Sequence, residues 1–269
     1  MCLIIIAYQA DPRYPLVVAA NRDEFFTRPT AQADFWPSEQ ANGNEEPENP
    51  QQVLAGRDLL AGGTWLGISR SGRFAAVTNI RDPSQIEQKP RSRGELTRNF
   101  LSGSESAQDY SNSLISSFDE FAGYNLLVGD SESLIYVNNL EQKVWKVKPG
   151  IHGLSNSLLN SPWPKVDQGK QSLENLLNSD QELNTDSLIA MMNNREQAAD
   201  DDLPDTGVPI ELERKLSSAF IQNTERHYGT LCSSAVVFDN SGEIRFCEQN
   251  YSESGAKAGS HFYHLLPQL

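Results

Sequence analysis

Short apolar segments that come in hairpin-like pairs most restrict what this 269-residue chain can fold into. Residues 3–8 and 16–20 flank a short polar turn, and residues 64–69 and 74–79 are joined by a turn that contains a glycine. Such pairs are typical of β-hairpins, in which neighbouring strands run antiparallel. The pattern therefore favours antiparallel sheets over a doubly wound parallel sheet, whose strands need helical crossovers.

Segments with helical patterning occur in blocks between groups of strands. Helices are predicted at residues 92–101, 107–118, 166–177, 186–193 (behind a Thr185 cap) and 211–220. Further short strands are expected at residues 124–129, 134–138, 144–147, 152–155, 231–238 and 244–249. Because this order contains no repeat and no dividing linker, we predict a single α+β domain over residues 1–269.

Composition narrows the classes of partner. The chain has 36 acidic and 22 basic residues, a formal net charge of −14, which disfavours nucleic acid and anionic membrane surfaces and leaves a small-molecule ligand. The N-terminus lacks the basic segment of a signal peptide, and no window approaches the ~20 apolar residues of a membrane span. Three cysteines without CxxC spacing argue against a disulfide framework and a metal site. We therefore expect a cytoplasmic protein without integral membrane association.

Cys2 directly follows the initiator methionine. Aminopeptidases remove that methionine when the next residue is small, and the mature chain would then carry a thiol and a free α-amine on one residue. Because the α-amine has a pKa near ~7.7–8.0, part of it is a free base near neutral pH. This combination predicts a nucleophile with its own base, suited to acyl transfer. The alternative is a buried cysteine that only starts a strand.

Four polar residues follow the second predicted strand directly: Asn21, Arg22, Asp23 and Glu24. If residues 3–8 and 16–20 form a hairpin, these side chains lie beside Cys2. A carboxylate there could orient the α-ammonium, and the arginine would favour the thiolate. The alternative is an ion-pair cluster at a strand end.

Two asparagines at predicted strand ends are candidate oxyanion ligands. Asn79 follows the apolar residues 74–78, and Asn156 follows residues 152–155. Amide donors held on rigid strands stabilise a developing oxyanion, often by ~3–4 kcal/mol per donor. Asparagine is also common in turns, so each position alone indicates little.

Several longer motifs resemble one family. They are "MCLI", "ANRDE", "LAGRD", "GGTWLGIS", "TNIRDP", "SRGELTRNFL", "GLSNS" and "YGTLCSS". In this order they are similar to the NRDE family, also called the transport-and-Golgi-organisation family. Leu231 departs from the pattern, because family members often carry arginine there. The resemblance implies a four-layer αββα sandwich of two mainly antiparallel sheets, similar to the N-terminal-nucleophile hydrolases.

The same resemblance implies a catalytic set. In the branch that contains bile-salt hydrolase and penicillin V acylase, an N-terminal cysteine attacks an amide without a cofactor. Arginine and aspartate surround that cysteine, and asparagines form the oxyanion hole. This set corresponds here to Cys2, Arg22, Asp23, Asn79 and Asn156. Arg226 is a weaker candidate for the distal arginine of that branch.

The family itself is associated with haem mobilisation inside cells and is linked to acyl-coenzyme A and lipid metabolism. The resemblance therefore implies haem as a transported ligand, and haem-donating or haem-accepting proteins as partners. No CxxCH motif for covalent haem attachment is present, and His261 and His264 are expected in a solvated tail. Arginines would bind the propionates, and Phe25, Phe26 or Trp65 would contact the ring. The predicted ligand-binding residues are Asn21, Glu24, Arg57, Trp65, Arg81 and Arg226.

Three hypotheses follow. The first is a cytoplasmic haem-handling protein that uses a hydrolase-like cleft. The second is a cysteine amidohydrolase or acyltransferase that acts on an amide or acyl substrate through Cys2. The third is a non-catalytic interaction module. The walls of the pocket depend on loops such as residues 42–52, whose conformation the sequence does not specify.

Overall fold

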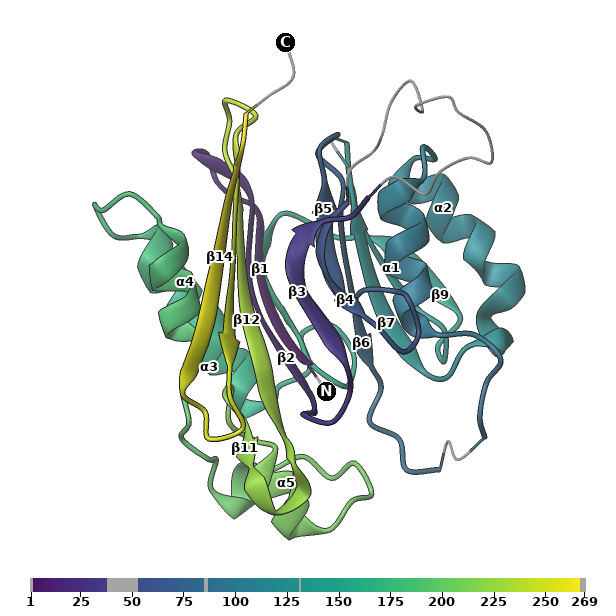
Figure 1. The fold of residues 1–269 in the computed structure, drawn as a ribbon, viewed down its shortest axis with the longest axis vertical. Helices are drawn as coiled ribbons and strands as arrows, with labels where there is room; N and C mark the ends of the chain where they lie inside the picture. The colour runs from purple at the N-terminus through teal and green to yellow at the C-terminus, as the bar shows by residue number, and fades with distance from the viewer. Residues whose placement is uncertain (1, 38–52, 85–86, 131, 267–269) are drawn as a thin grey trace. The chain divides into compact units, whose positions relative to one another are not determined.

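The computed structural model describes residues 2–37, 53–84, 87–130 and 132–266, so Met1 and the loop at residues 42–52 lie outside the described residues. The chain forms two compact units. The first comprises Met1–Arg28, Thr78–Glu87 and Lys148–Leu269, and the second comprises Pro29–Val77 and Gln88–Val147. Each unit contains one seven-stranded sheet with helices (Figure 1).

The sheet of the first unit is antiparallel throughout. Its strand order is β10-β1-β2-β12-β13-β14, with β11 paired to β12. Cys2 is opposite Arg22 and Tyr8 is opposite Leu16, which confirms the predicted hairpin of the first two strands. The strands are β1 (Cys2–Asp11), β2 (Tyr14–Phe25), β10 (Gly150–Leu154), β11 (Gln222–Asn223), β12 (Tyr228–Phe238), β13 (Ile244–Tyr251) and β14 (Lys257–Leu265).

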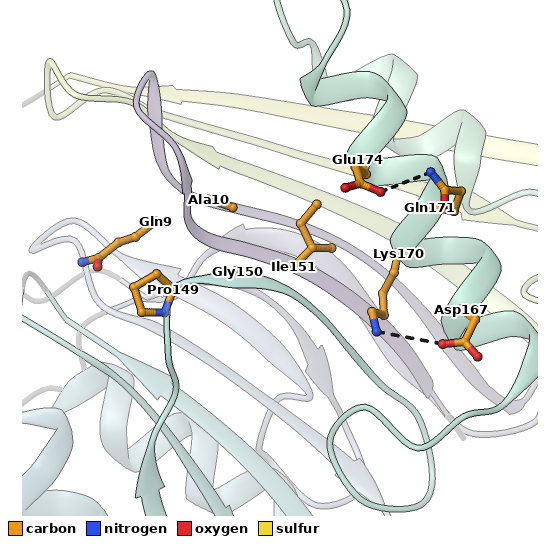
Figure 2. A pocket seen from close by; sticks show the side chains of 9 residues that line it. All are labelled: Gln9, Ala10, Pro149, Gly150, Ile151, Asp167, Lys170, Gln171 and Glu174. Atoms are coloured by element: carbon orange, nitrogen blue, oxygen red, sulfur yellow. Dashed lines mark hydrogen bonds and ion pairs between the residues drawn. The ribbon is translucent and has the colours of Figure 1, made fainter.

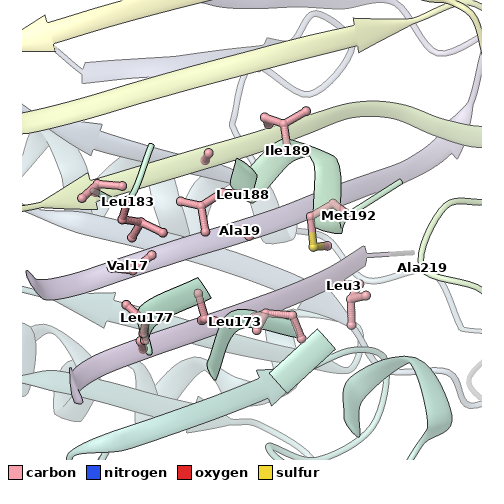
Figure 3. Close-up of a cluster of buried hydrophobic side chains, with 14 of the residues drawn as sticks. Leu3, Val17, Ala19, Leu173, Leu177, Leu183, Leu188, Ile189, Met192 and Ala219 are labelled. Carbon is pink, nitrogen blue, oxygen red and sulfur yellow. The ribbon is translucent and has the colours of Figure 1, made fainter. Parts of the chain in front are cut away.

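Two helices cover one face of this sheet, α3 (Pro164–Leu177) and α4 (Thr185–Met191) (Figure 1). Because side chains alternate along a strand, Leu3, Ile5 and Ala7 of β1 all point to this face. They pack with Val17 and Ala19 of β2 and with Leu173 and Leu177 of α3 in a buried apolar cluster (Figure 3). Burial of this cluster, at ~25 cal/mol per Å² of apolar surface, attaches the helices to the sheet.

A glycine lets α3 approach the sheet closely. A Cβ at Gly169 would lie 2.6 Å from Cδ1 of Ile5, closer than side-chain carbons pack. On the facing strand β10, a Cβ at Gly153 would lie 2.6 Å from Cγ1 of Val166. Since neither residue has a side chain, α3 lies against β1 and β10, with its first turn near their ends.

The second unit has its own sheet and core. Its strand order is β3-β4-β5-β6-β7-β8-β9, and α1 (Arg93–Ser102) and α2 (Ala107–Ser113) contribute to one buried cluster with it. Phe100, Tyr110, Phe121 and Tyr124 are large members of this cluster. The strands are β3 (Thr30–Phe35), β4 (Val53–Asp58), β5 (Leu66–Ser69), β6 (Phe74–Asn79), β7 (Tyr124–Gly129), β8 (Leu134–Asn138) and β9 (Lys143–Lys146).

The α+β class with two mainly antiparallel sheets is confirmed, and the four-layer order stays a prediction. Several element bounds were wrong. The helix predicted at residues 211–220 ends early, as α5 (Ile210–Lys215), where the hydroxyls of Ser217 and Ser218 bond backbone carbonyls and compete with the helix. The helix predicted at residues 107–118 is α2 followed by a 3-10 helix, Leu114–Glu120. Asn184, not Thr185, caps α4.

Four strands were not predicted: the edge strands β3 and β14, the interior strand β4 and the two-residue strand β11. The strand β14 alternates exposed and partly buried residues, and His261 and His264 belong to it rather than to a solvated tail. An edge strand has a neighbour on one side only, so it needs little apolar character and resembles a loop in sequence. In the part of the chain that the structure describes, no helix combines the length and hydropathy needed to cross a bilayer.

Candidate functional site

Three neighbouring strands of the first unit bring Cys2, Arg22 and Cys232 side by side. Cys2 of β1 is directly opposite Arg22 of β2, and Arg22 is directly opposite Cys232 of β12. Residues opposite each other across antiparallel strands point to the same face. Since Leu3 points to the helix-covered face, Cys2 and Arg22 point to the other face of this sheet.

The Cys2 thiol is buried, with 7% of the residue exposed. Burial raises the pKa of this thiol above its ordinary value, and the Asp23 carboxylate adds to the rise. The Arg22 guanidinium and a hydrogen bond from the Asp23 backbone act in the opposite direction. Near neutral pH the resting side chain is therefore a thiol, which needs a base before it can attack an acyl group.

Asp23 is a buried carboxyl group at the end of β2. The Thr230 hydroxyl donates to Asp23 Oδ1 at 2.7 Å, and the Tyr228 hydroxyl donates to the Asp23 backbone carbonyl at 3.1 Å. Desolvation raises the pKa of Asp23, whereas Lys165, the Thr230 hydrogen bond and Arg81 act to lower it. Asp23 is thus electrostatically coupled both to Cys2 and to two buried cations.

Lys165 is a buried ammonium group in the first turn of α3. Its Nζ donates to the Leu216 carbonyl at 2.9 Å. Burial and the nearby Arg81 lower the pKa of Lys165 to about 8, while Asp23, Cys2 and Glu213 limit the fall. A cation in the first turn also opposes the helix dipole, so this position is poor for stability and fits a functional role.

Arg81 and Glu213 form a buried ion pair. Nη1 of Arg81 donates to Oε2 of Glu213, and the Thr206 backbone and hydroxyl both donate to Oε1 of the same carboxylate. Arg81 also lies over the indole of Trp163, with Cζ 4.8 Å from the ring centroid. Burial lowers the pKa of Arg81, and the Glu213 carboxylate opposes this.

The two predicted oxyanion residues, Asn79 and Asn156, lie together near Cys2. Nδ2 of Asn156 donates to the Asn79 carbonyl at 2.9 Å, and the Arg81 backbone N–H donates to the Asn156 carbonyl at 2.7 Å. The Ser155 hydroxyl donates to the Cys2 carbonyl at 3.0 Å, so the residues after β10 contact the start of β1. An amide nitrogen has two hydrogens, and the Asn79 carbonyl accepts one of those on Asn156.

Asn21 lies on the helix-covered face, away from Cys2. Its Nδ2 donates to the Met192 and Ala219 carbonyls, both at 2.8 Å, and its Oδ1 accepts from the Ser233 hydroxyl. These bonds hold β2 to the end of α4. The Asn21 amide is therefore engaged in packing contacts of the first unit.

The other predicted ligand-binding residues are dispersed. Glu24 is half-buried and accepts from the Phe25 backbone at 2.9 Å, and Arg226 is exposed in the turn Thr224–Arg226. Arg57 and Trp65 belong to the second unit. Arg57 Cζ lies 4.8 Å from the centroid of the indole ring of Trp36. Their roles stay predictions.

Buried charge is concentrated in the first unit. Burying an ion costs several kcal/mol unless partners compensate for lost hydration. Strongly perturbed ionisable groups that gather around a nucleophile are typical of functional sites. The almost wholly buried ionisable residues of this unit are Arg22, Asp23, Arg81, Lys165, Glu213 and Glu248.

Comparison with known proteins decides the family. The sequence profile of the family described as Transport and Golgi organisation 2 matches residues 1–253. The chain belongs to the Transport and Golgi organisation 2 family. A human Transport and Golgi organization protein 2 homolog is 35% identical over 93% of both chains, and the Bos taurus homolog is 33% identical over 93% of both. A solved N-acylethanolamine-hydrolysing acid amidase ortholog from Caenorhabditis elegans aligns at 11% identity and TM-score 0.47, over 88% of this chain and 92% of that chain.

In this Transport and Golgi organisation 2 family member, sequence reasoning missed Lys165, Trp163 and Glu213. Lys165 directly precedes the helix predicted at residues 166–177, and a lysine at a helix start was a usable indication because the helix dipole disfavours a cation there. Tyr228 and Thr230 stand in the "YGTLCSS" motif, but their contacts with Asp23 depend on strand pairing. Nothing in the local sequence singles out Glu213.

A pocket of about 660 Å³ lies elsewhere in the first unit, near the far end of β1 (Figure 2). In it, Lys170 Nζ is 3.9 Å from Asp167 Oδ1, and Gln171 donates to Glu174 at 3.2 Å. The other lining residues are Gln9, Ala10, Pro149, Gly150 and Ile151. Its charged residues are Asp167, Lys170 and Glu174, of which none is buried, and no cysteine lines it, so this pocket differs from the surroundings of Cys2. Among the described residues, no three His, Cys, Asp or Glu side chains gather in a metal-binding arrangement.

Proposed function

We propose that this family member is a cysteine-dependent amidohydrolase or acyltransferase with Cys2 as nucleophile. The observation that carries the proposal is the direct pairing of Cys2 with Arg22 beside Asp23. A guanidinium on the neighbouring strand favours the thiolate once a base has taken the thiol proton. The roles of Asn79 and Asn156 as oxyanion donors belong to the same proposal. It is supported by the hydrogen bond between these two residues and by the bond from Ser155, the neighbour of Asn156, to the Cys2 carbonyl.

The reaction would proceed in two steps. In the first, the base takes the thiol proton, the Cys2 sulfur bonds to the acyl carbon, and the bond to the leaving amine or thiol breaks as that group receives the proton. In the second, water or an acceptor attacks the thioester, releases the acyl product and restores the thiol. The proposed base is the α-amine of Cys2, which requires removal of Met1.

Acylation can be tested with p-nitrophenyl acetate, an activated acyl donor. We expect a burst of p-nitrophenolate and a hydroxylamine-sensitive acetyl group on the Cys2 peptide, both lost in Cys2→Ser. Cys247→Ser is the matched control, because Cys247 is also buried but belongs to the helix-side core. Acetylation of other residues alone, or a full burst in Cys2→Ser, would contradict the proposal. The mass of the first peptide from the native host tests the base, and a retained Met1 would exclude it.

Haem handling in the cytoplasm is a second candidate, motivated by the family resemblance. The structural feature that favours it is Phe25, which is 49% exposed and packs edge-on against Tyr228 at 5.1 Å between ring centroids. Titration with haem should give a saturable Soret shift that weakens in Phe25→Ala. No saturable shift at micromolar protein would contradict this function, and cell fractionation tests the location.

A further inference from the structure

Arg81 has an unused hydrogen-bonding edge inside the protein. Its side chain is 7% exposed, and its Nη1 donates to Glu213. Among the described residues, Nε and Nη2 of Arg81 have no hydrogen-bond partner. A buried donor without an acceptor destabilises the folded protein, so an edge with two such donors is costly unless a ligand binds there.

The unused edge has the shape of a carboxylate receptor. Two other arginines of the chain use the same pair of nitrogens to hold one carboxylate. Nε and Nη2 of Arg13 donate to Asp11 at 3.0 and 2.7 Å, and those of Arg214 donate to Asp200 at 2.8 and 2.7 Å. This parallel two-bond arrangement is the strong mode of arginine–carboxylate binding. Glu213 accepts from Nη1 instead, which leaves the two-donor edge of Arg81 open.

Lys165 supplies a second cation that contacts the same indole as Arg81. Its Nζ lies 5.9 Å from the centroid of the Trp163 ring, the same indole that Arg81 contacts at 4.8 Å. The ammonium donates to a neutral carbonyl, that of Leu216, and no ion pair to Lys165 forms within the described part of the chain. Among the described residues, Glu213 is the carboxylate bonded to one of these two cations, Arg81, and Asp23 acts on both without a hydrogen bond to either.

We propose that Arg81 and Lys165, together with Trp163, form a subsite for the carboxylate of a small-molecule ligand. The Nε and Nη2 donors of Arg81 bind its two oxygens, and Lys165 provides the neighbouring charge. This subsite deepens the proposed function, because it lies in the unit that carries Cys2 and would select acyl compounds with a carboxylate. Carboxylate binding itself needs no thiol, so it can be tested independently of catalysis.

The test uses acetate as the probe and follows the arginine Nε–H resonances by NMR at constant ionic strength. One Nε–H signal, assigned through its loss in Arg81→Lys, should move saturably with acetate. Arg81→Lys keeps the charge but removes the two-donor edge, and we expect at least a tenfold weaker acetate affinity, measured by thermal shift. Arg214→Lys is the matched control, since its edge is already occupied by Asp200 and exposed, and it should leave the affinity unchanged.

Two further arms separate the outcomes. Lys165→Met should also weaken acetate at least tenfold, which keeps the proposal testable if Arg81→Lys fails to fold. Cys2→Ser should keep acetate binding, so failure of catalysis does not imply failure of the subsite. No saturable shift in the folded wild-type protein, or equal effects of acetate and inorganic phosphate, would overturn the assignment to a carboxylate.

Discussion

Cys2 and Arg22 are directly opposite each other on the neighbouring antiparallel strands β1 and β2. This register brings a thiol and a guanidinium to the same face of the sheet in the first unit. Asp23 follows at once in the chain and is bonded to Thr230 of the next strand, β12. Strand pairing therefore brings a nucleophile, a cation and a carboxyl group close together.

The first prediction concerns the reactivity of the Cys2 thiol. Because burial raises its pKa, alkylation by iodoacetamide should be slow at pH 7 and rise about tenfold per pH unit until the thiol is ionised. The rate is measured by mass spectrometry of the Cys2 peptide in a Cys232→Ser, Cys247→Ser background. A rate that is fast and flat between pH 6 and 8 would show a thiolate in the resting protein and contradict the prediction.

The second prediction concerns the pH dependence of stability at Lys165. In the folded protein its pKa is about 8, below the ordinary 10.5. Between these values the unfolded chain binds the proton and the folded chain does not, so the free energy of unfolding should rise with pH. The rise attributable to this group is about 3 kcal/mol.

Urea denaturation of the wild type and of Lys165→Met, compared between pH 7.5 and 10.5, isolates that contribution because other titrations cancel. Lys143→Met is the control, since the Lys143 side chain is 60% exposed and should show no such difference. If the difference in the free energy of unfolding between the wild type and Lys165→Met stays constant over this pH range, the lowered pKa of Lys165 is wrong.

The third prediction concerns the support of Asp23. Thr230→Val keeps the shape of the side chain but removes the donor to Asp23 Oδ1 and the acceptor of the Ile221 backbone N–H. We expect a loss of about 1–3 kcal/mol in the free energy of unfolding. Ser241→Ala removes a similar hydroxyl–carboxylate bond, 2.6 Å to Asp239 at an exposed turn, and should cost far less. Equal losses of stability in the two variants would argue against a buried Asp23 that needs the Thr230 hydrogen bond.

The fourth prediction separates packing from ligand binding at Asn21. Asn21→Ala leaves the buried Met192 and Ala219 carbonyls without their donor, so it should cost about 2–4 kcal/mol of stability. Acetate affinity of the variant that remains folded should be unchanged. Asn240→Ala, which removes an exposed bond to the Pro12 carbonyl, is the control for stability. A loss of acetate affinity without a loss of stability would show that Asn21 contributes to ligand binding.

Much of the first unit's sheet follows from local patterns. The unbroken apolar runs at residues 3–8 and 16–20, with a short turn between them, predict that the two strands pair, and the turn limits the register. The polar edge strands β3 and β14 could not be found in this way. Each has a neighbouring strand on one side only, so it needs few apolar residues. Helix ends were misplaced where serine hydroxyls compete for backbone carbonyls, as at Ser217.

The sequence by itself determined the hairpin and so placed Cys2 beside residues 21–24, because two apolar runs joined by a short turn pair antiparallel. The structure decided that Arg22 is the residue opposite Cys2. Only the tertiary structure decided that Asn21 points into the helix-side packing and that Lys165, Glu213 and Arg81 meet over Trp163. Those residues stand as many as 132 positions apart. The position of Lys165 follows α3, whose close approach to β1 and β10 is allowed by Gly169 and Gly153, and no local pattern encodes that packing.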